Sequence, residues 1–215
     1  LKALNEAKDN FVTTVSHDMR APLNTISGFI HGLVDVGPLN EQQQLFVERT
    51  HKATKHMMSL VNGLLELASL NTEIERQYLP CDLMEIVTNV VNEFQGQSLT
   101  KSVTLTLDSA AADGVVKGDA AQLRRALRNL VDNALKYAPD KSDVQVKFTA
   151  VAPHLTIAVQ DQGPGIPEKD LPFIFDKFYR GKDNGEIVGT GLGLALVKSI
   201  AEAHGGQVWA ENQNS

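Results

Sequence analysis

The chain has a single cysteine, Cys81, among its 215 residues, so it can form neither an internal disulfide nor a metal site built from several thiolates. Such sparing use of cysteine is typical of a reducing compartment. No apolar run approaches the roughly 20 residues of a membrane-spanning helix, and no signal-peptide pattern is present. Basic residues are also scarce, with 20 Lys and Arg against 26 Asp and Glu. Since binding to nucleic acid favours a basic stripe, nucleic acid is not expected as a partner.

What remains is the composition of a folded protein. Hydrophobic residues make up 42% of the chain and charged residues 21%, which is enough for packed cores. The length suits one large or two modest domains, at ~100–200 residues per domain. The first residue lies inside a helical pattern, and the last follows a strand-like stretch, Gln207–Asn212. We therefore expect the chain to be part of a longer protein.

Two amphipathic helices are predicted at the start of the chain. Apolar residues recur at helical spacing from Leu4 to Leu33 and, near a heptad spacing, from Phe46 to Leu67. Gly37-Pro38 separates the two helices, which predicts an antiparallel hairpin. A hairpin alone buries too little surface to be stable, so we expect a second copy to complete a four-helix bundle. Packing of the hairpin on the rest of its own chain is the alternative.

The remainder of the chain mixes helices and strands. Helices are predicted from Asp82 to about Gln95, from Asp119 to Tyr137, and before Gly205-Gly206, the first two with capping residues at their starts. Alternating apolar residues predict strands over residues 102–107, 114–118, 144–150 and 155–159. Because the two kinds of element do not alternate regularly, the pattern predicts an α+β fold with helices on one face of a mixed sheet.

The helix predicted over residues 119–137 has a polar flank beside its apolar stripe. At about 100° per residue, Asn129, Asn133 and Lys136 cluster on this flank, and Tyr137 lies between flank and stripe. An amide oxygen can bind a metal ion and an ammonium can bind phosphate, so the set suits a phosphate-bound cation. A solvated polar face is an equally weighted alternative.

Asp161 follows the strand predicted over residues 155–159 and shares the parity of its inward-facing residues. A carboxylate that faces a core is costly unless it has a partner, and a ligand N–H such as an exocyclic amine is a suitable one. Gly163 and Gly165 would let a flat ring approach the backbone. The alternative is an aspartate that caps a turn at the end of the strand.

A glycine-rich turn, Gly189 to Gly193, precedes the last predicted helix. The free N–H groups and partial positive charge of a helix N-terminus favour an anion there. The turn matches neither the dinucleotide fingerprint, because no strand leads into it, nor the P-loop, because the Gly-Lys-Ser/Thr ending is missing. Together with the two preceding features it predicts a nucleotide site, with phosphates at the turn, a metal ion at Asn133 and adenine at Asp161.

Five stretches, in order, resemble the motifs of the cytoplasmic core of sensor histidine kinases of two-component signalling. They are Phe11–Asn24 (histidine box), Asn129–Tyr137 (asparagine box), Asp161–Pro167 (first glycine box), Phe173–Gly181 (phenylalanine box) and Gly189–Leu194 (second glycine box). The resemblance implies a helical hairpin for dimerisation and histidine phosphotransfer over residues 1–72. It further implies a linker over residues 73–79 and a two-layer α/β sandwich that binds ATP over residues 80–215.

The resemblance also implies roles for single residues. Asn133 would hold Mg²⁺, Asn129 and Lys136 would contact phosphates, Tyr137 would stack near adenine, and Asp161 would read the adenine amino group.

The segment from Phe175 to Thr190 would form a lid over ATP, in which Arg180 contacts phosphate. The further nucleotide contacts implied by the resemblance are Gly163, Gly165, Phe175, Phe178, Gly189, Thr190, Gly191, Leu192 and Gly193.

His17 would be the phosphoacceptor. It is rotated by roughly 200–240° from Phe11 and Val15 at the helical period, so it projects away from the apolar stripe. A nucleophilic imidazole must be neutral at the attacking nitrogen, and a carboxylate bonded to the other nitrogen favours that tautomer. Asp18 is the candidate base or orienting group, although adjacent residues do not face each other on an ideal helix. An ordinary surface histidine is the alternative that His17 alone would favour.

Asn129 bears on the reaction type. In ATPases that share this nucleotide fold, a glutamate stands four residues before the metal-binding asparagine and activates water. Asn129 occupies that place here and cannot take a proton, so transfer to His17 is favoured over hydrolysis. A non-catalytic ATP-binding scaffold and a hydrolytic ATPase clamp remain the alternatives. The intact set of His17, Asp18, Asn133 and Asp161 argues against the scaffold.

The chain departs from the family pattern in three places. Many relatives carry threonine or asparagine four residues after the histidine, whereas this chain has Ala21, which puts phosphatase activity in doubt. Asp18 replaces the more frequent glutamate. The closing strand that usually follows the last helix is missing or truncated, which would expose a sheet edge.

The expected partner is the receiver domain of a response regulator. We expect this fragment in the cytoplasm, with membrane attachment only through segments outside the chain.

Overall fold

The computed structural model of the chain describes residues 2–69, 78–109, 114–151, 154–181 and 189–213, with backbone only for residues 2–14, 16–17, 66–69 and 151. Contacts divide the chain into two compact units, Leu1–Glu73 with Val188–Leu192 and Ile74–Ile187 with Gly193–Ser215. None of the helices in the described part of the chain is long and apolar enough to span a membrane.

The helices and strands alternate irregularly along the chain, as expected for α+β. In order they are α1 (Lys2–Val36), α2 (Glu41–Ser69), β1 (Leu79–Asp82), α3 (Leu83–Thr100), β2 (Thr104–Ser109), β3 (Val115–Gly118), α4 (Ala120–Tyr137), β4 (Asp143–Val151), β5 (His154–Gln160), the 3₁₀ turn η1 (Leu171–Phe173) and α5 (Gly193–Ala203).

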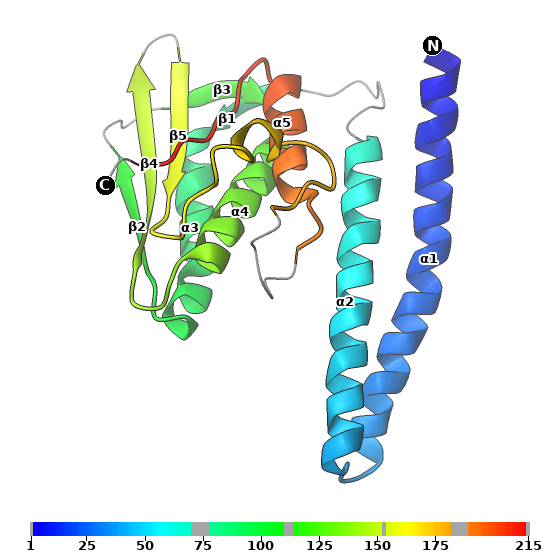
Figure 1. Cartoon of the computed structure of the whole chain (residues 1–215). Helices are drawn as coiled ribbons and strands as arrows, with labels where there is room; N and C mark the ends of the chain where they lie inside the picture. The colour runs from blue at the N-terminus through cyan, green and yellow to red at the C-terminus, as the bar shows by residue number, and fades with distance from the viewer. Residues whose placement is uncertain (1, 70–77, 110–113, 152–153, 182–188, 214–215) are drawn as a thin grey trace. The chain divides into compact units, whose positions relative to one another are not determined.

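Helices α1 and α2 form the predicted antiparallel hairpin (Figure 1). The second helix begins with a reciprocal cap that the sequence analysis did not identify: Asn40 Oδ1 accepts from Gln43 N at 2.8 Å, and Asn40 N donates to Gln43 Oε1 at 2.9 Å. Pro22 lies inside α1, and Figure 1 shows that the axis of this helix changes direction in its middle part. Proline cannot donate the helical hydrogen bond of its turn, which accounts for a bend.

Only part of the predicted apolar stripe of the hairpin is buried. Leu23 and Ile30 of this stripe are less than 9% exposed, as are Thr54 and Val61, which lie outside the predicted stripe. Large apolar residues that remain exposed along the two helices are Val15, Met19, Ile26, Phe29, Leu33, Val34, Val36, Leu45, Phe46 and Met57. One chain therefore leaves a long apolar surface on the hairpin in contact with water, which is unusual for a monomer.

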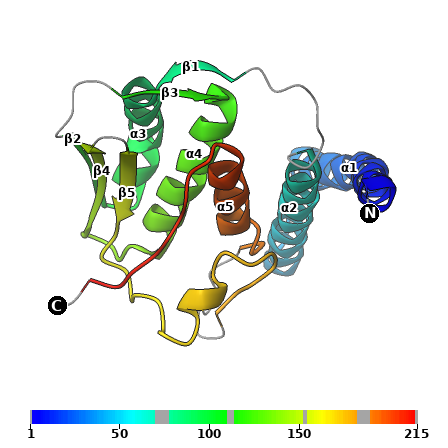
Figure 2. The same cartoon turned by 90° about the horizontal axis from the view of Figure 1, so that it is seen from above.

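The second unit is built on two sheets. Strands β2, β4 and β5 form a sheet in the order β2-β4-β5, with β2 parallel to β4 and β4 antiparallel to β5. Figure 2 shows α3, α4 and α5 lying along one side of this sheet. The helix-on-sheet layering confirms the predicted α/β two-layer arrangement. A second sheet pairs β3 with β1, a strand that the sequence analysis assigned partly to the linker.

The core lies between the sheet and helices α3 and α4. Val131 and Leu135 of α4 pack with Val144 and Phe148 of β4, and all four side chains are fully buried. Period-two burial along β4 and a helical stripe on α4 meet at this layer, as the apolar pattern predicted. This layer orients α4, because the stripe can face the sheet in only one rotation of the helix.

The start of α4 is fixed by Asp119, which directly precedes the helix, and by His204, which follows α5. Asp119 caps the helix, since its Oδ1 accepts from Ala121 N at 3.0 Å and from Gln122 N at 3.2 Å. The backbone N–H of Asp119 donates to His204 Nε2 at 3.0 Å, in place of the reciprocal bond that Gln122 would make in a capping box. His204 Nδ1 lies 2.7 Å from Ile200 O, so the hydrogen is on Nδ1 and Nε2 is the acceptor. A histidine without a motif around it is most often an ordinary surface residue, but His204 is half-buried and links the end of α5 to the start of α4.

The stretch Gln207–Asn212 was read as strand-like, but residues 206–213 form neither helix nor strand. They lie close to the edge of β5, where Gln160 Nε2 donates to Gln213 Oε1 at 2.7 Å. Alternating residues alone do not make a strand, because the backbone groups need a ladder partner.

His204→Ala is expected to destabilise the second unit by about 1–3 kcal/mol, because it leaves the Asp119 N–H without its acceptor and removes the edge-to-face contact with Tyr78. Urea unfolding followed by the fluorescence of Trp209, the only tryptophan, measures this change. His154→Ala, at an exposed histidine of β5, is the matched control and should shift the midpoint little. Equal midpoints for the two variants would contradict the assignment.

Candidate functional site

The polar flank of α4 faces the N-terminus of α5. A Cβ placed on Gly193, the first residue of α5, would lie 3.0 Å from Asn129 Oδ1 and 3.9 Å from Asn133 Nδ2. Asn129 is turned in this direction because its Nδ2 donates to Arg125 O at 3.0 Å. Both carboxamides are half-buried rather than fully solvated. The amide oxygen of Asn129 and the amide group of Asn133 thus lie beside the N–H groups and partial positive charge of a helix start, an arrangement that suits an anion together with its counter-cation.

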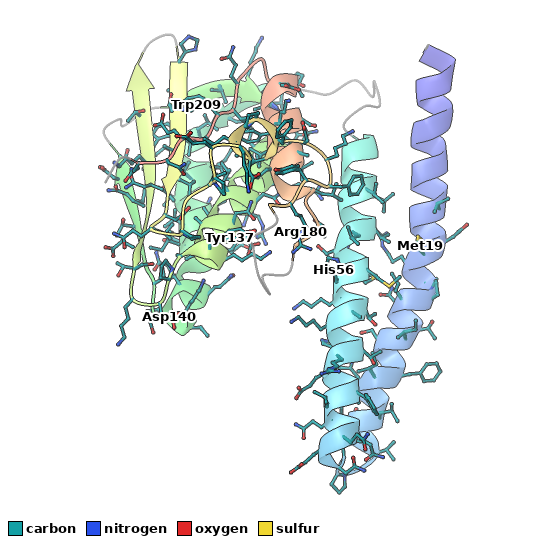
Figure 3. All side chains as sticks on the ribbon, in the orientation of Figure 1. Met19, His56, Tyr137, Asp140, Arg180 and Trp209 are labelled. Carbon is teal, nitrogen blue, oxygen red and sulfur yellow. The ribbon has the colours of Figure 1, made fainter. Side chains whose placement is uncertain are left out.

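Positive charge gathers at the C-terminal end of the same flank. Burial lowers the pKa of the Lys136 ammonium, and the nearby Arg180 guanidinium lowers it further, whereas Asp132 opposes both. Figure 3 marks Arg180 and Tyr137, the residue that ends α4. Two cations held close together gain from a multiply charged anion between them, because it would offset their mutual repulsion.

The parity of the strand predicted that Asp161 faces the core. In the structure Asp161 is instead exposed. The strand β5 ends at Gln160, so the parity of its residues does not extend to residue 161. Its Oδ1 accepts from Gly163 N at 2.7 Å and caps the turn that starts there. A side chain at Gly163 would force its neighbours to shift, because a Cβ there would lie 2.6 Å from Asp161 Oδ1 and 3.1 Å from the carbonyl oxygen of Tyr137. The turn therefore brings Asp161 next to the end of α4.

The rest of this glycine-rich loop is tied to other elements by side chains. Gln162 Oε1 accepts from Asp143 N at 3.0 Å, and Asn212 bonds to both backbone polar groups of Ile166. Gly165 has φ +74°, a conformation that favours glycine. Neither Gln162 nor Asn212 was predicted as part of the site, and local spacing contains no signal for a contact 46 residues apart such as that between Asn212 and Ile166.

Within the phenylalanine-rich segment, residues 170–181, Tyr179 contacts residues near the start of the segment. The Tyr179 hydroxyl donates to Oδ1 of the buried Asp170 at 2.8 Å, a bond that raises the pKa of the Tyr179 phenol. The ring of Tyr179 packs 5.7 Å from that of Phe173. Phe175 is half-buried, whereas Phe178 is 54% exposed and has φ +66°. A positive φ is unusual for a bulky residue and marks local strain.

The predicted lid lies partly outside the described residues, because residues 182–188 are not described. Gly189, Thr190, Gly191 and Leu192 directly precede α5 in the chain. Within this turn Leu192 N donates to Thr190 Oγ1 at 3.3 Å, and Gly191 has φ +69°. The turn therefore delivers the chain to the α5 N-terminus through a glycine in the left-handed region.

Comparison with known families assigns both parts of the chain. Residues 7–73 match the His Kinase A (phospho-acceptor) domain, and residues 118–215 match the histidine kinase-, DNA gyrase B- and HSP90-like ATPase. A solved structure, the mycobacterial sensor histidine kinase MprB, is 30% identical and matches over 60% of this chain and 80% of its own, with a TM-score of 0.53. The chain belongs to the sensor histidine kinases.

Curated relatives of this histidine kinase core are longer proteins. The phosphate regulon sensor protein PhoR of Pseudomonas aeruginosa is 34% identical over 205 residues, which cover 94% of this chain and 46% of PhoR. The sensor histidine kinase WalK of Bacillus subtilis is 30% identical over 217 residues, 97% of this chain and 35% of WalK. The chain thus spans less than half the length of these two relatives. Full-length ShkA, solved in complex with AMPPNP, matches 95% of this chain and 43% of its own at 27% identity, with a TM-score of 0.76.

The phospho-acceptor domain of the kinase core carries His17 within α1. The His17 side chain lies outside the described residues, so its predicted orientation stays a prediction. Asp18 and Ala21, one residue and about one turn further along the helix, are both exposed. The carbonyl oxygen of Ala21 accepts from Thr25 Oγ1 at 3.0 Å.

Gly163→Ala is expected to weaken ATP binding by about tenfold or more, because the new methyl would displace the Asp161 carboxylate, and a hydrogen bond to a charged group contributes about that much. Equilibrium titration with a fluorescent ATP analogue measures the change. Gly96→Ala in α3 is the matched control, since a Cβ there meets nothing within 4 Å. Unchanged affinity in Gly163→Ala would show that the carboxylate position is irrelevant to binding.

Proposed function

We propose that the chain is the kinase core of a two-component sensor, which transfers the γ-phosphoryl group of ATP to His17 and then to an aspartate in the receiver domain of a response regulator. The observation that carries the proposal is the placement of Asn129 and Asn133 against the N-terminus of α5. Such a reaction draws on cytoplasmic ATP, so we place this part of the protein in the cytoplasm.

The nucleotide is held by groups from three segments. Asp161 accepts a hydrogen bond from the adenine amino group, beside Tyr137, and the turn at Gly163 and Gly165 leaves room for the ring. Asn129, Lys136, Arg180 and the N–H groups at the start of α5 contact the phosphates. The half-buried Lys136 and its lowered pKa fit this role, because the negative charge of a bound triphosphate would stabilise the ammonium and so counter the lowering caused by burial and by Arg180.

Asn133 would hold Mg²⁺ through its amide oxygen. No cluster of three or more His, Cys, Asp or Glu side chains that could hold a metal ion occurs among the described residues, so most other ligands would be phosphate oxygens and water, as Mg²⁺ prefers. The ion would neutralise charge on the transferred phosphoryl group. The position of Asn133 beside Gly193 fits this, because it directs the carboxamide toward the phosphate region.

His17 acts as the nucleophile. A lone pair on one ring nitrogen forms the P–N bond while the bond between the γ-phosphorus and the bridging oxygen breaks, and ADP leaves with that electron pair. Asp18 accepts the hydrogen bond from the other ring nitrogen and so favours the reactive tautomer. In the second step a receiver carboxylate attacks the phosphorus and the imidazole leaves.

Water is a poor competitor in this site. The position from which a glutamate would activate water is occupied by Asn129, whose Nδ2 is already bonded to Arg125 O. A carboxamide cannot accept the proton of an attacking water, so net ATP hydrolysis is expected to be slow.

We also propose that the hairpin dimerises. Apolar side chains that include Ile26 (42%), Phe29 (71%) and Leu33 (54%) are exposed on the hairpin, and a second hairpin would cover such a surface in a four-helix bundle. The domain boundaries 1–72 and 80–215 remain proposals of the same kind.

Incubation with γ-labelled ATP and Mg²⁺ is expected to label wild-type protein with an acid-labile, base-stable phosphate. His17→Gln should abolish the label, because no nucleophile remains at that position. His56→Gln on α2 is the control and should retain the label. Rapid release of labelled phosphate without labelled protein would favour a hydrolytic ATPase, and label that survives His17→Gln would refute the assignment of the phosphoacceptor.

Ala21→Thr is expected to increase dephosphorylation of the phosphorylated receiver domain by tenfold or more, roughly the gain from positioning one water molecule. The alanine methyl cannot orient water, whereas a hydroxyl at the same exposed position can. Ala21→Val, which matches threonine in shape but lacks the hydroxyl, is the control. The rate of loss of labelled phosphate from the receiver measures the effect, and equal rates for wild type and Ala21→Thr would contradict it.

A further inference from the structure

Asn212 holds the far end of the glycine-rich loop that follows β5. Ile166 N donates to Asn212 Oδ1 at 2.8 Å, and Asn212 Nδ2 donates to Ile166 O at 2.6 Å. One carboxamide thus satisfies both backbone polar groups of one residue, as the neighbouring strand of a sheet would do. We call this pair of hydrogen bonds between Asn212 and Ile166 the Asn212 clamp.

The clamp and Asp161 fix opposite ends of the same loop. At the near end, Asp161 Oδ1 accepts from Gly163 N at 2.7 Å. At the far end, the clamp fixes Ile166, and Pro164 restricts the backbone between the two ends. The side-chain oxygen of Asn212 also comes close to the loop, since a Cβ on Gly165 would lie 3.1 Å from it. A loop of six residues, 161–166, is therefore held in one shape by two side chains.

The segment that carries Asn212 has its own attachment to β5. Gln213 accepts from Gln160 Nε2 at 2.7 Å, so the clamp is anchored to the last residue of the strand that leads into the loop. The loop, the strand end and the C-terminal segment thereby form a closed ring of contacts. Directly after Ile166, Pro167 O accepts from Asp170 N at 2.8 Å and closes a local turn.

We propose that Asn212 is a positioning residue for adenine recognition: it holds the loop in the shape that presents Asp161 to the base. The inference rests on the proposed function, because it takes Asp161 to be the group that reads adenine. Asn212 itself does not touch the nucleotide. Its effect should therefore fall on affinity for adenine and on base selectivity, and not on the chemical step.

Asn212→Ala removes both bonds, and Asn212→Asp keeps the acceptor for Ile166 N while it opposes Ile166 O with a negative oxygen. We expect Asn212→Ala to raise the Kd for ATP about tenfold, the effect of one or two hydrogen bonds, with a smaller rise for Asn212→Asp. The Kd for GTP should change little, so the ratio of the two constants falls. Autophosphorylation at saturating ATP should stay close to the wild-type rate.

Glu211→Gln is the matched control, because it alters the exposed residue on the other side of Asn212 and leaves both the clamp and its anchor at Gln213 in place. A measurement without nucleotide complements the titrations: the Ile166 amide should exchange its hydrogen slowly in wild type and Glu211→Gln, and quickly in Asn212→Ala. The exchange rate and Asn212→Asp keep the test decisive if Asn212→Ala folds poorly.

The possible outcomes separate the two proposals. If wild-type protein binds no adenine nucleotide, the proposed function fails, and the inference fails with it. If wild-type protein binds ATP and Asn212→Ala binds it equally well, the inference alone is wrong. An equal loss of ATP and GTP binding would also overturn it, since a merely structural role predicts that result.

Discussion

The packing of α4 against the sheet is the constraint on which the candidate site depends. Val131 and Leu135 are fully buried on one side of this helix, so its rotation about its own axis is fixed. That rotation directs Asn129 and Asn133 toward the first residue of α5. Hydrophobic packing has no preferred direction of its own, but by fixing the rotation of α4 it determines where the polar side chains of this helix point. A helix free to rotate could not keep two carboxamides beside the N-terminus of its neighbour.

The features that sequence predicted well are those governed by local periodicity. The helical stripes gave α1, α2 and α4 with nearly correct bounds, and the capping role of Asp82 and Asp119 followed from their spacing to the first turn. The grouping of Asn129, Asn133 and Lys136 on one flank is likewise a consequence of the helical period. Each of these depends on residues a few positions apart, where geometry is almost independent of the rest of the fold.

Features that depend on distant partners were missed or misread. Strand β1 is four residues long and contains Pro80, so it carries little strand signal and exists through its pairing with β3. Asp161 lies just beyond the end of β5, where the alternation of inward and outward positions no longer applies. His204 and Asn212 gain their roles from contacts 85 and 46 residues away in the chain, which no local pattern encodes. The apolar stripe of the hairpin was identified, and too little burial within one hairpin was expected, but periodicity could not predict which apolar residues stay exposed.

Pro22 has a mechanical consequence for the first helix. Without an amide hydrogen, residue 22 cannot contribute to the ladder of backbone hydrogen bonds that stiffens α1, a helix whose axis changes direction in its middle part. Bending stiffness is therefore lowest about one turn from position 17. A twist or tilt imposed at one end of α1 would therefore deform the helix mainly at this turn, where one backbone hydrogen bond is missing.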